Sequence, residues 1–430
     1  MKKTYALVGT GGRAEFFYGA LAADFKDSSK LIAFCDSNET RMGYANELLQ
    51  TKYEHEAVAV YRAEQFESMI QSEQPDVVIV TTVDRTHHTY IIKALELGCD
   101  VITEKPMTVD EEKCRQIMDA IDRTGRNVRV TFNYRYAPHN TKIREIIKSG
   151  VLGEVYSVNF EWALDTQHGA DYFRRWHRDK RNSGGLLVHK STHHFDLVNF
   201  WLGTFPETVY AAGGLRFYGK ENAEERGVTR FYQRAHGSGA AKSDPFAIQL
   251  AENPHLKAMY LDAEAEDGYQ RDQSVFGDGI SIEDTLGVLV TYKNKAILNY
   301  SLNAYLPWEG YLVSFNGSKG RMEVKVREQS YINSGGNKQE EGSIEEKSIV
   351  ILPMFGAPYE IDVSETEGGH GGGDPELLRD LFGEPRDDEF HRAASHIDGA
   401  MSILTGIAGN HSLKTGEAVK IDSLIQWKKA

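Results

Sequence analysis

Cysteine is scarce in this chain, and long hydrophobic runs are absent from it. The 430 residues contain three cysteines, Cys35, Cys99 and Cys114. They show neither CxxC spacing nor a disulfide framework, so we expect buried free thiols. No stretch approaches the roughly 18 apolar residues of a membrane-spanning helix. The first residues also lack the apolar core and cleavage site of a secretory signal. We therefore expect a cytoplasmic protein without a membrane partner.

Basic residues are also fewer than acidic ones. Lys and Arg total 49 against 63 Asp and Glu, a net charge of −14. Such a surface repels nucleic-acid phosphates and anionic lipid, which argues against both as partners, although a local basic pocket for one phosphate group is still compatible with it. With 40% hydrophobic and 26% charged residues, the composition is that of a globular protein. At this length we expect two domains.

Residues 1–133 alternate short apolar runs with helical patterns, which predicts parallel βα units in a doubly wound Rossmann domain of the α/β class. We expect strands at residues 3–8, 30–35, 76–81, 100–103 and 126–132. We expect helices at residues 16–23, 41–49 and 89–97. Thr108 is predicted to open another helix, with Glu111 three residues on completing a capping box.

Residues 134–430 follow a different pattern, which predicts an α+β domain built around one sheet. We expect a helix at 141–148 and strands at 155–164, 286–292, 296–304 and 311–315, with a hairpin turn at Lys293–Asn294. Residues 213–284 are polar and irregular, too long for a plain connection, and are interpreted as a functional insertion. Residues 330–347 are expected to form a mobile hairpin or loop.

The strongest local motif is the glycine-rich turn after the first strand. Gly9, Gly11 and Ala14 in Val-Gly-Thr-Gly-Gly-Arg-Ala fit the G-x-G-x-x-G/A spacing, with Gly12 and Arg13 between them. Gly9 permits the tight turn, Gly11 lets the backbone approach a pyrophosphate, and Ala14 lets the helix pack on the strand. The helix N-terminus then favours the phosphates. A glycine turn without a ligand is the alternative interpretation.

Asp36 ends the second expected strand. A carboxylate there accepts hydrogen bonds from ribose hydroxyls and repels a 2′-phosphate, which favours NAD(H). Arg41 leaves NADP(H) open if its side chain folds back toward the ribose.

Glu104-Lys105-Pro106 follows the strand at 100–103, at the end of the sheet where open α/β folds place ligands. Lys105 there can hold a substrate hydroxyl or lower its pKa as a nearby cation. Pro106 makes a cis peptide bond reasonable. A surface turn is the alternative.

Residues 189–196 concentrate groups suited to acid–base chemistry. If this segment is helical, one face carries His194, Leu197, Val198 and Trp201, and the other carries His189, His193, Asp196 and Phe200. His194 is expected to be a packed core histidine, and Asp196 could orient His193. Histidines four residues apart also suit a divalent metal, but no HExxH glutamate or nearby cysteine accompanies them. We expect no metal.

Together these motifs resemble the Gfo/Idh/MocA family of glucose–fructose oxidoreductase, inositol dehydrogenase and rhizopine-catabolism proteins. The resemblance rests on GTGGRA, Asp36, VTTVDRTHH, ALELGCDVITEKPM and the SGGLL…NFWLG stretch, in family order. It implies an N-terminal NAD(H)-binding Rossmann domain and a second domain with a large, mostly antiparallel open sheet. It also implies a homo-oligomer, a dimer or tetramer, formed through the outer sheet face.

The resemblance also implies site residues. The family pattern places cofactor contacts at Gly9, Gly11, Gly12, Arg13, Ala14, Asp36, Thr82, Asp84, His87, Glu104 and Lys105. Val83 replaces the family's proline. Lys105 is similar to the catalytic lysine and His193 to the proton-accepting histidine, with Asp196 as the following acid. Where many members have D-x-G-x-H, this chain has His189 and Lys190, which leaves the proton relay and substrate class open.

The expected reaction is reversible oxidation of a secondary alcohol on a sugar, polyol or glycoside. Arg175, Trp176 and His177 are candidates to grip the sugar, with a solvated loop as the alternative. His370 in a glycine-rich stretch, together with Asp374, can add substrate contacts, with a plain linker as the alternative. Two other functions stay open: an NAD-retaining glycosidase that works by transient oxidation and elimination, and a non-catalytic NAD-binding sensor.

Overall fold

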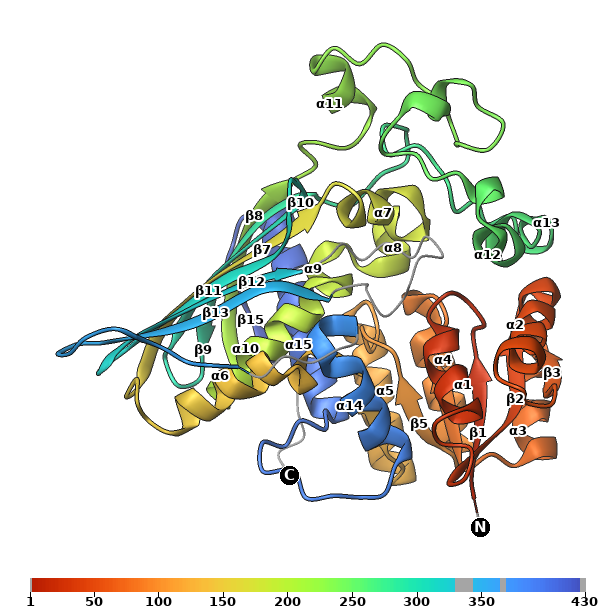
Figure 1. The fold of residues 1–430 in the computed structure, drawn as a ribbon, viewed down its shortest axis with the longest axis horizontal. Coiled ribbons are helices and arrows are strands. Elements are labelled where there is room, and N and C mark those ends of the chain that lie inside the picture. Colours follow the sequence, from red (N-terminus) through yellow and green to blue (C-terminus); the bar gives the residue numbers. More distant parts are fainter. Residues whose placement is uncertain (1, 329–342, 364–368, 426–430) are drawn as a thin grey trace.

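The computed structural model describes residues 2–328, 343–363 and 369–425 (Figure 1). It has a Rossmann-like parallel sheet at the N-terminal end of the chain and a larger, mostly antiparallel sheet after it. The predicted α/β class is confirmed. In the described part of the chain, no helix combines the length and apolar character needed to cross a bilayer.

The first sheet has the strand order β3-β2-β1-β4-β5-β6, with every pair parallel. Its strands are β1 (Lys3–Val8), β2 (Ser29–Asp36), β3 (Ala59–Arg62), β4 (Val77–Val80), β5 (Asp100–Thr103) and β6 (Val128–Val130). Its helices are α1 (Ala14–Ala22), α2 (Glu39–Lys52), α3 (Phe66–Glu73), α4 (His87–Glu96) and α5 (Glu111–Thr124). All four residues of β4 are buried, as expected for a strand covered on both faces. The chain reverses its direction across the sheet between β1 and β4, where such folds bind ligands.

Two expectations for this domain need correction. Helix α5 begins at Glu111, and the residue that caps it is Asp110, whose carboxylate accepts a hydrogen bond from the Lys113 backbone N–H (2.8 Å). The expected capping box at Thr108 is therefore wrong, and the helix begins two residues later than that cap implies. The reason is that the Asp110 carboxylate accepts the hydrogen bond from the otherwise unpaired Lys113 N–H group. Strand β3 and helix α3 were not expected, since the strand has only four residues and the helix only eight. Cys35, Cys99 and Cys114 are buried and free, as predicted.

The second sheet is nine-stranded in the described residues, with the order β14-β13-β12-β11-β7-β10-β9-β8-β15. Its strands are β7 (Val155–Asp165), β8 (Pro206–Gly214), β9 (Thr285–Tyr292), β10 (Ile297–Leu306), β11 (Glu309–Gly317), β12 (Gly320–Glu328), β13 (Ile344–Pro353), β14 (Tyr359–Glu360) and β15 (Val419–Lys420). Strands β9 and β10 form the expected hairpin, and β10 pairs with β7 in parallel. Most of the loop expected at 330–347 lies outside the described residues, and its last part is the start of β13.

Helices of the second domain pack on one face of this sheet and around the junction with the first domain (Figure 1). They are α6 (Pro138–Lys148), α7 (His168–Arg174), α8 (Lys180–Ser183), α9 (Leu186–His189), α10 (Ser191–Leu202), α14 (Gly369–Phe382), α15 (His396–Thr415) and α16 (Ile421–Leu424). The segment after β8 carries the short helices α11 (Lys220–Glu225), α12 (Pro254–Leu256) and α13 (Glu264–Asp267). In Figure 1 this segment extends away from the sheet and returns to lie against α2.

Candidate active site

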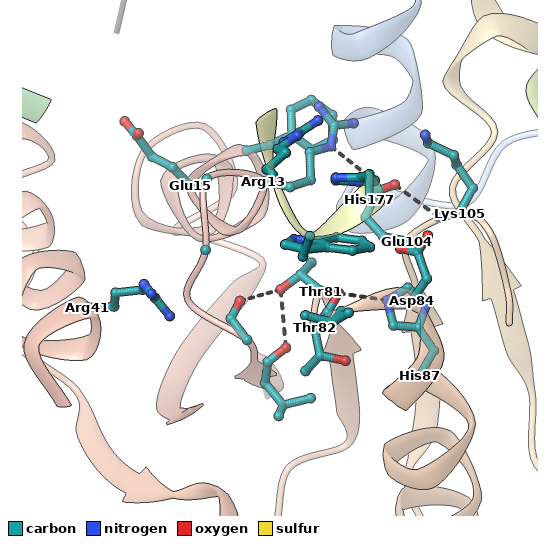
Figure 2. Close-up of a pocket in the computed structure, with 18 of the residues that line it drawn as sticks. Arg13, Glu15, Arg41, Thr81, Thr82, Asp84, His87, Glu104, Lys105 and His177 are labelled. Atoms are coloured by element: carbon teal, nitrogen blue, oxygen red, sulfur yellow. Dashed lines mark hydrogen bonds and ion pairs between the residues drawn. The ribbon is translucent and has the colours of Figure 1, made fainter. Parts of the chain in front are cut away.

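A cavity of about 1080 Å³ lies between the carboxyl ends of the Rossmann strands and the second domain (Figure 2). Its volume is at the upper end for small-molecule sites, enough for an extended cofactor and a substrate together. All predicted site residues except Ala14 and Asp196 line it: Gly9, Gly11, Gly12, Arg13, Asp36, Thr82, Asp84, His87, Glu104, Lys105, Arg175, Trp176, His177, His189, Lys190, His193 and His370. Figure 2 shows Arg13, Lys105 and His177 above Thr81 and Thr82 in the view.

The glycine-rich turn has the shape that a dinucleotide requires. Gly9 has φ +92°, and a Cβ there would lie 2.7 Å from the backbone of Thr81 and Thr82, so only glycine fits. A Cβ at Gly11 would meet nothing within 4 Å, which leaves space for a phosphate to approach the backbone. Ala14 is fully buried at the start of α1, in the packing role predicted for it.

The Asp36 carboxylate is held at the end of β2. It accepts hydrogen bonds from the backbone N–H (2.5 Å) and hydroxyl (2.9 Å) of Thr10, in the glycine-rich turn, and from the N–H of Asn38 (3.0 Å). These bonds fix the carboxylate beside the turn and in the cavity wall, where a ribose is expected.

Lys105 enters the cavity from the turn after β5. The Lys105–Pro106 peptide bond is cis, as the sequence suggested. The Lys105 Nζ lies 3.4 Å from the carbonyl oxygen of His189, which belongs to the second domain. Burial lowers the pKa of Lys105 to about 8, partly opposed by the Glu104 carboxylate. Glu104 itself accepts a hydrogen bond from Arg13 Nε (2.6 Å), which ties this turn to the glycine-rich turn.

His87 contacts the backbone of the turn that carries Lys105. Its Nδ1 lies 2.9 Å from the carbonyl oxygen of Pro106 and its Nε2 lies 3.0 Å from that of Thr82. The imidazole therefore bridges the two backbone segments on which Thr82 and Lys105 sit. Although His87 lines the cavity, both of its ring nitrogens are engaged with the chain itself.

His193 reaches the same cavity from α10. It is buried against the rings of Phe132 and Tyr134, with ring centroids 5.9 and 5.1 Å away. Its Nδ1 is buried and has no hydrogen-bond partner in the described structure. Burial, together with the charges of Lys105 and Lys190, holds the pKa of His193 well below its ordinary value. The imidazole is therefore neutral at pH 7 and able to accept a proton.

His189 stands where many Gfo/Idh/MocA proteins are expected to have an aspartate. Its Nδ1 lies 2.5 Å from Oδ2 of Asp84, a residue of the Rossmann domain. Asp84 thus places a carboxyl group from the Rossmann side of the cleft against His189. Lys190 beside it is buried, with its Nζ 4.9 Å from the ring of Trp162, and burial lowers its pKa, partly opposed by the Glu309 and Glu328 carboxylates.

The predicted sugar-gripping loop is ordered by a buried carboxylate. Asp171 on α7 pairs with Arg175 (Nε–Oδ2 3.0 Å), and also with Arg174 (3.1 Å) and Arg271 (2.6 Å). Trp176 stacks on His177 with ring centroids 3.5 Å apart. Arg175, Trp176 and His177 all line the cavity, so they are part of its wall and not a solvated loop.

The glycine-rich stretch around His370 also belongs to the wall. His370 Nδ1 lies 2.9 Å from Oδ2 of Asp374, and Asn133 Nδ2 donates to Oδ1 of the same carboxylate (2.6 Å). Arg13 of the Rossmann turn lies 3.9 Å from that carboxylate. His370, Gly371 and Gly372 have φ between 52° and 83°, a left-handed run that glycine permits.

Comparison with known proteins fits this geometry. A family model described as "Oxidoreductase family, NAD-binding Rossmann fold" matches residues 3–132, and one described as "Oxidoreductase family, C-terminal alpha/beta domain" matches residues 144–421. The chain belongs to the Gfo/Idh/MocA oxidoreductase family. Its first domain is the NAD-binding Rossmann domain of that family, and NAD is its cofactor.

Relatives in this family differ in how much of the chain they share. YteT of Bacillus subtilis (strain 168) is 38% identical over 389 residues, covering 86% of this chain and 87% of its own. The D-glucoside 3-dehydrogenase of Escherichia coli (strain K12) is 30% identical and covers 47% of this chain and 54% of its own. The solved WlbA dehydrogenase of Bordetella pertussis, in complex with NADH and UDP-GlcNAcA, has a TM-score of 0.63 at 17% identity, covering 98% of this chain and 99% of its own.

Asp196 is not in the site, and the expectation that it orients His193 is wrong. Its two carboxylate oxygens accept hydrogen bonds from Nε and Nη2 of Arg135 (2.7 and 2.6 Å), and Arg135 also pairs with Asp398 (2.9 Å). His193 and Asp196 both lie on α10, but the Asp196 carboxylate is bound by the buried Arg135 and does not line the cavity. His194 is a packed core histidine, as predicted: it stacks on Trp162 and bonds the Tyr300 hydroxyl (2.6 Å).

The ion pair of Asp196 leads to a stability prediction. Asp196→Asn removes the fully buried one of the two carboxylates that pair with the Arg135 guanidinium, so we expect the free energy of unfolding to fall by about 3–5 kcal/mol. Urea unfolding measures the change. The matched control is Glu346→Gln, which breaks the exposed pair with Lys325 and should cost below about 1 kcal/mol. Equal losses for the two variants would contradict this assignment.

Sequence reasoning missed several residues of the cavity wall. Asp171 had a local signal, because arginines three and four residues later share its helix face. Tyr260, Asp267 and Tyr269 from the insertion had none, since only the fold brings them to the cofactor domain. The described ranges contain no group of three or more His, Cys, Asp or Glu side chains arranged to hold a metal ion.

Proposed function

We propose that this protein is an NAD(H)-dependent dehydrogenase that oxidises a secondary alcohol of a sugar, polyol or glycoside. The observation that carries the proposal is the meeting of Lys105, from the Rossmann domain, and His193, from the second domain, in one cavity with the glycine-rich turn and Asp36. Bound NAD supplies the hydride acceptor for this chemistry.

Residues of the chain itself stabilise the reacting oxygen, accept its proton and position the lysine. Lys105 Nζ donates a hydrogen bond to the reacting hydroxyl oxygen and stabilises the negative charge that develops there. His193, neutral because of its burial, takes the hydroxyl proton at Nε2, the ring nitrogen other than the buried Nδ1. The Asp84–His189 pair holds the carbonyl that Lys105 contacts, and so positions the lysine.

We propose that residues of the second domain, on the cavity wall opposite the Rossmann strands, bind the sugar. Trp176 offers a flat ring for sugar C–H edges, and Arg175 offers hydrogen bonds to hydroxyl or carboxylate groups. His177, Lys190 and His370 add donors from the second domain. The dehydrogenase relatives that act on glucosides and inositol support a substrate of this class.

The test is a spectrophotometric screen of NAD⁺ against polyols, aldoses and glycosides. We expect NADH absorbance with one substrate group, and none with the Lys105→Met variant. Product formation without any NADH would instead establish the NAD-retaining glycosidase. NAD binding without turnover of any substrate would leave only the sensor.

We also propose that the protein is a homo-oligomer through the uncovered face of the second sheet. Tyr210 and Leu289 lie opposite each other on β8 and β9, and their side chains are 43% and 42% exposed. Such apolar pairs on an open sheet favour contact with a second copy.

Charging that sheet face should break the oligomer. We expect the double variant Tyr210→Glu/Leu289→Glu to sediment as a monomer, because two carboxylates cannot be buried unpaired in an interface. Val60→Glu, at a 50% exposed apolar position of the Rossmann domain, is the control that should leave the assembly intact. Analytical ultracentrifugation distinguishes the forms, and a monomeric wild type would refute the proposal.

A further inference from the structure

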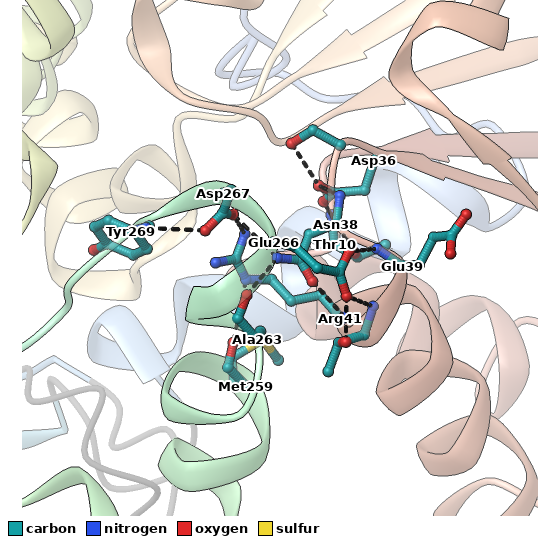
Figure 3. Close-up of polar contacts among 12 residues, drawn as sticks. Thr10, Asp36, Asn38, Glu39, Arg41, Met259, Ala263, Glu266, Asp267 and Tyr269 are labelled. Atoms are coloured by element: carbon teal, nitrogen blue, oxygen red, sulfur yellow. Dashed lines mark hydrogen bonds and ion pairs between the residues drawn. The ribbon is translucent and has the colours of Figure 1, made fainter.

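The insertion between β8 and β9 forms hydrogen bonds with the Rossmann domain at the turn that follows Asp36 (Figure 3). Asn38 Nδ2 donates to the carbonyl oxygen of Ala263 (2.9 Å), and Arg41 Nε donates to that of Met259 (3.1 Å). Both acceptors belong to the second domain. The contact therefore places the acidic helix α13 at the end of the cofactor cleft where Asp36 marks the ribose position.

Glu266 of the insertion occupies the N-terminus of α2. Its carboxylate accepts hydrogen bonds from the backbone N–H groups of Glu39 (2.7 Å) and Thr40 (3.0 Å), and from the Thr40 hydroxyl. The hydrogen bond from the Thr40 hydroxyl lowers the pKa of Glu266, so the group is charged near neutral pH. Free N–H groups at the start of a helix are favourable partners for an anion. Here an internal carboxylate already uses them.

Asp267 forms an ion pair with Arg41, which follows the same turn. Its Oδ2 lies 2.7 Å from Arg41 Nη1, and the two side chains are only 19% and 10% exposed. Asp267 also lines the cavity together with Asp36. In Rossmann domains that accept NADP(H), an arginine near the end of the second strand receives the 2′-phosphate. Arg41 is at such a position but is directed to a carboxylate.

Arg62 is a second cation beside this turn. It is the register partner of Asp36 on the neighbouring strand β3, and its Nε lies 2.7 Å from Oε1 of Glu39. Asp36 and Asp267 thus line the cavity at the ribose position, and Glu266 lies beside it at the start of α2. The two cations, Arg41 and Arg62, are already paired. A 2′-phosphate, which carries up to two negative charges, would meet repulsion and find its usual donors taken.

We propose that Glu266 and Asp267, from the second domain, are specificity-determining residues that exclude the 2′-phosphate and restrict the protein to NAD(H). The insertion, whose function the sequence did not specify, thereby acts on cofactor choice. This inference rests on the proposed function, because it assumes that the adenosine ribose binds beside Asp36.

The test measures cofactor binding by isothermal titration calorimetry with NAD⁺ and NADP⁺. Wild type is expected to bind NADP⁺ at least about 30-fold more weakly than NAD⁺. In the double variant Glu266→Gln/Asp267→Asn we expect NADP⁺ affinity to rise about tenfold, while NAD⁺ affinity stays within about threefold. Adding Arg41→Met should abolish the gain, because the released guanidinium is what would bind the phosphate.

The control and the opposing outcomes are equally specific. Glu252→Gln removes an exposed carboxylate elsewhere on the insertion and should change neither affinity. Wild type that binds NAD⁺ but shows no NADP⁺ gain in the double variant overturns this inference and leaves the proposed function standing. Wild type that binds neither cofactor refutes the proposed function itself. If circular dichroism shows the double variant unfolded, the single variant Glu266→Gln decides, with a gain of about threefold expected and no gain overturning the inference.

Discussion

Lys105→Met should lower kcat for alcohol oxidation on the order of 10³-fold while leaving NAD⁺ affinity nearly unchanged. Lys105 Nζ is the cation placed to stabilise the developing alkoxide, and removing one preorganised donor from an enclosed site typically costs a factor of 10²–10³. Methionine is one heavy atom shorter than lysine and replaces its apolar stem without a charge, so we expect the turn at Pro106 to be preserved. Steady-state kinetics on the substrate found by the screen, with calorimetric NAD⁺ binding, measure both parts.

A matched variant separates charge from shape at this position. Lys105→Arg keeps a cation but enlarges the head group, so we expect an intermediate loss in kcat, about 10-fold to 10²-fold. His193→Gln should also lose on the order of 10²-fold or more, because a general base is removed. Lys105→Met and Lys105→Arg losing equally would mean that shape, not charge, is what the site needs. Full activity of Lys105→Met would refute the mechanism.

The second large effect is on the pH profile. We expect kcat/KM for oxidation to be level near pH 7 and to fall roughly tenfold per unit well above pH 8. Lys105 must be protonated, and burial lowers its pKa to about 8, so its cation is lost as the pH rises through that value. His193 must be neutral, and its pKa is held well below the ordinary value, so it is already deprotonated across the plateau.

The same variant tests the assignment of the basic limb. An arginine stays protonated above pH 10, so Lys105→Arg should move the fall in kcat/KM beyond that pH, on a lower plateau. NAD⁺ binding measured over the same range controls for loss of the cofactor. A wild-type profile that rises through pH 8 would mean that neutral Lys105 is the base, and the roles of Lys105 and His193 would be exchanged.

Much of the cofactor half of the site was predictable because its signals are local in sequence. The strand at residues 3–8, the glycine turn and Asp36 form one continuous βαβ unit, and the structure gives β1 the predicted bounds. The Glu104-Lys105-Pro106 turn likewise follows its strand directly. In each case the backbone geometry is set by residues within a few positions of one another.

The substrate half was less predictable because side-chain direction depends on packing. A helical wheel over residues 189–196 placed His193 and Asp196 on one face. In the structure both lie on α10, but Asp196 forms an ion pair with Arg135, 61 positions earlier, and only His193 lines the cavity. No local pattern carries that information, since a buried ion pair is selected by which charges the fold brings together.

The sequence by itself determined the Rossmann domain, its cofactor turn, the lysine turn and the presence of a histidine-rich helix, because periodicity and turn chemistry act over short distances. Only the tertiary structure decided which groups meet. It joins Asp84 to His189 across 105 positions and Arg41 to Asp267 across 226. Contacts of that span follow from the way strands and the insertion pack, and not from any neighbouring residues.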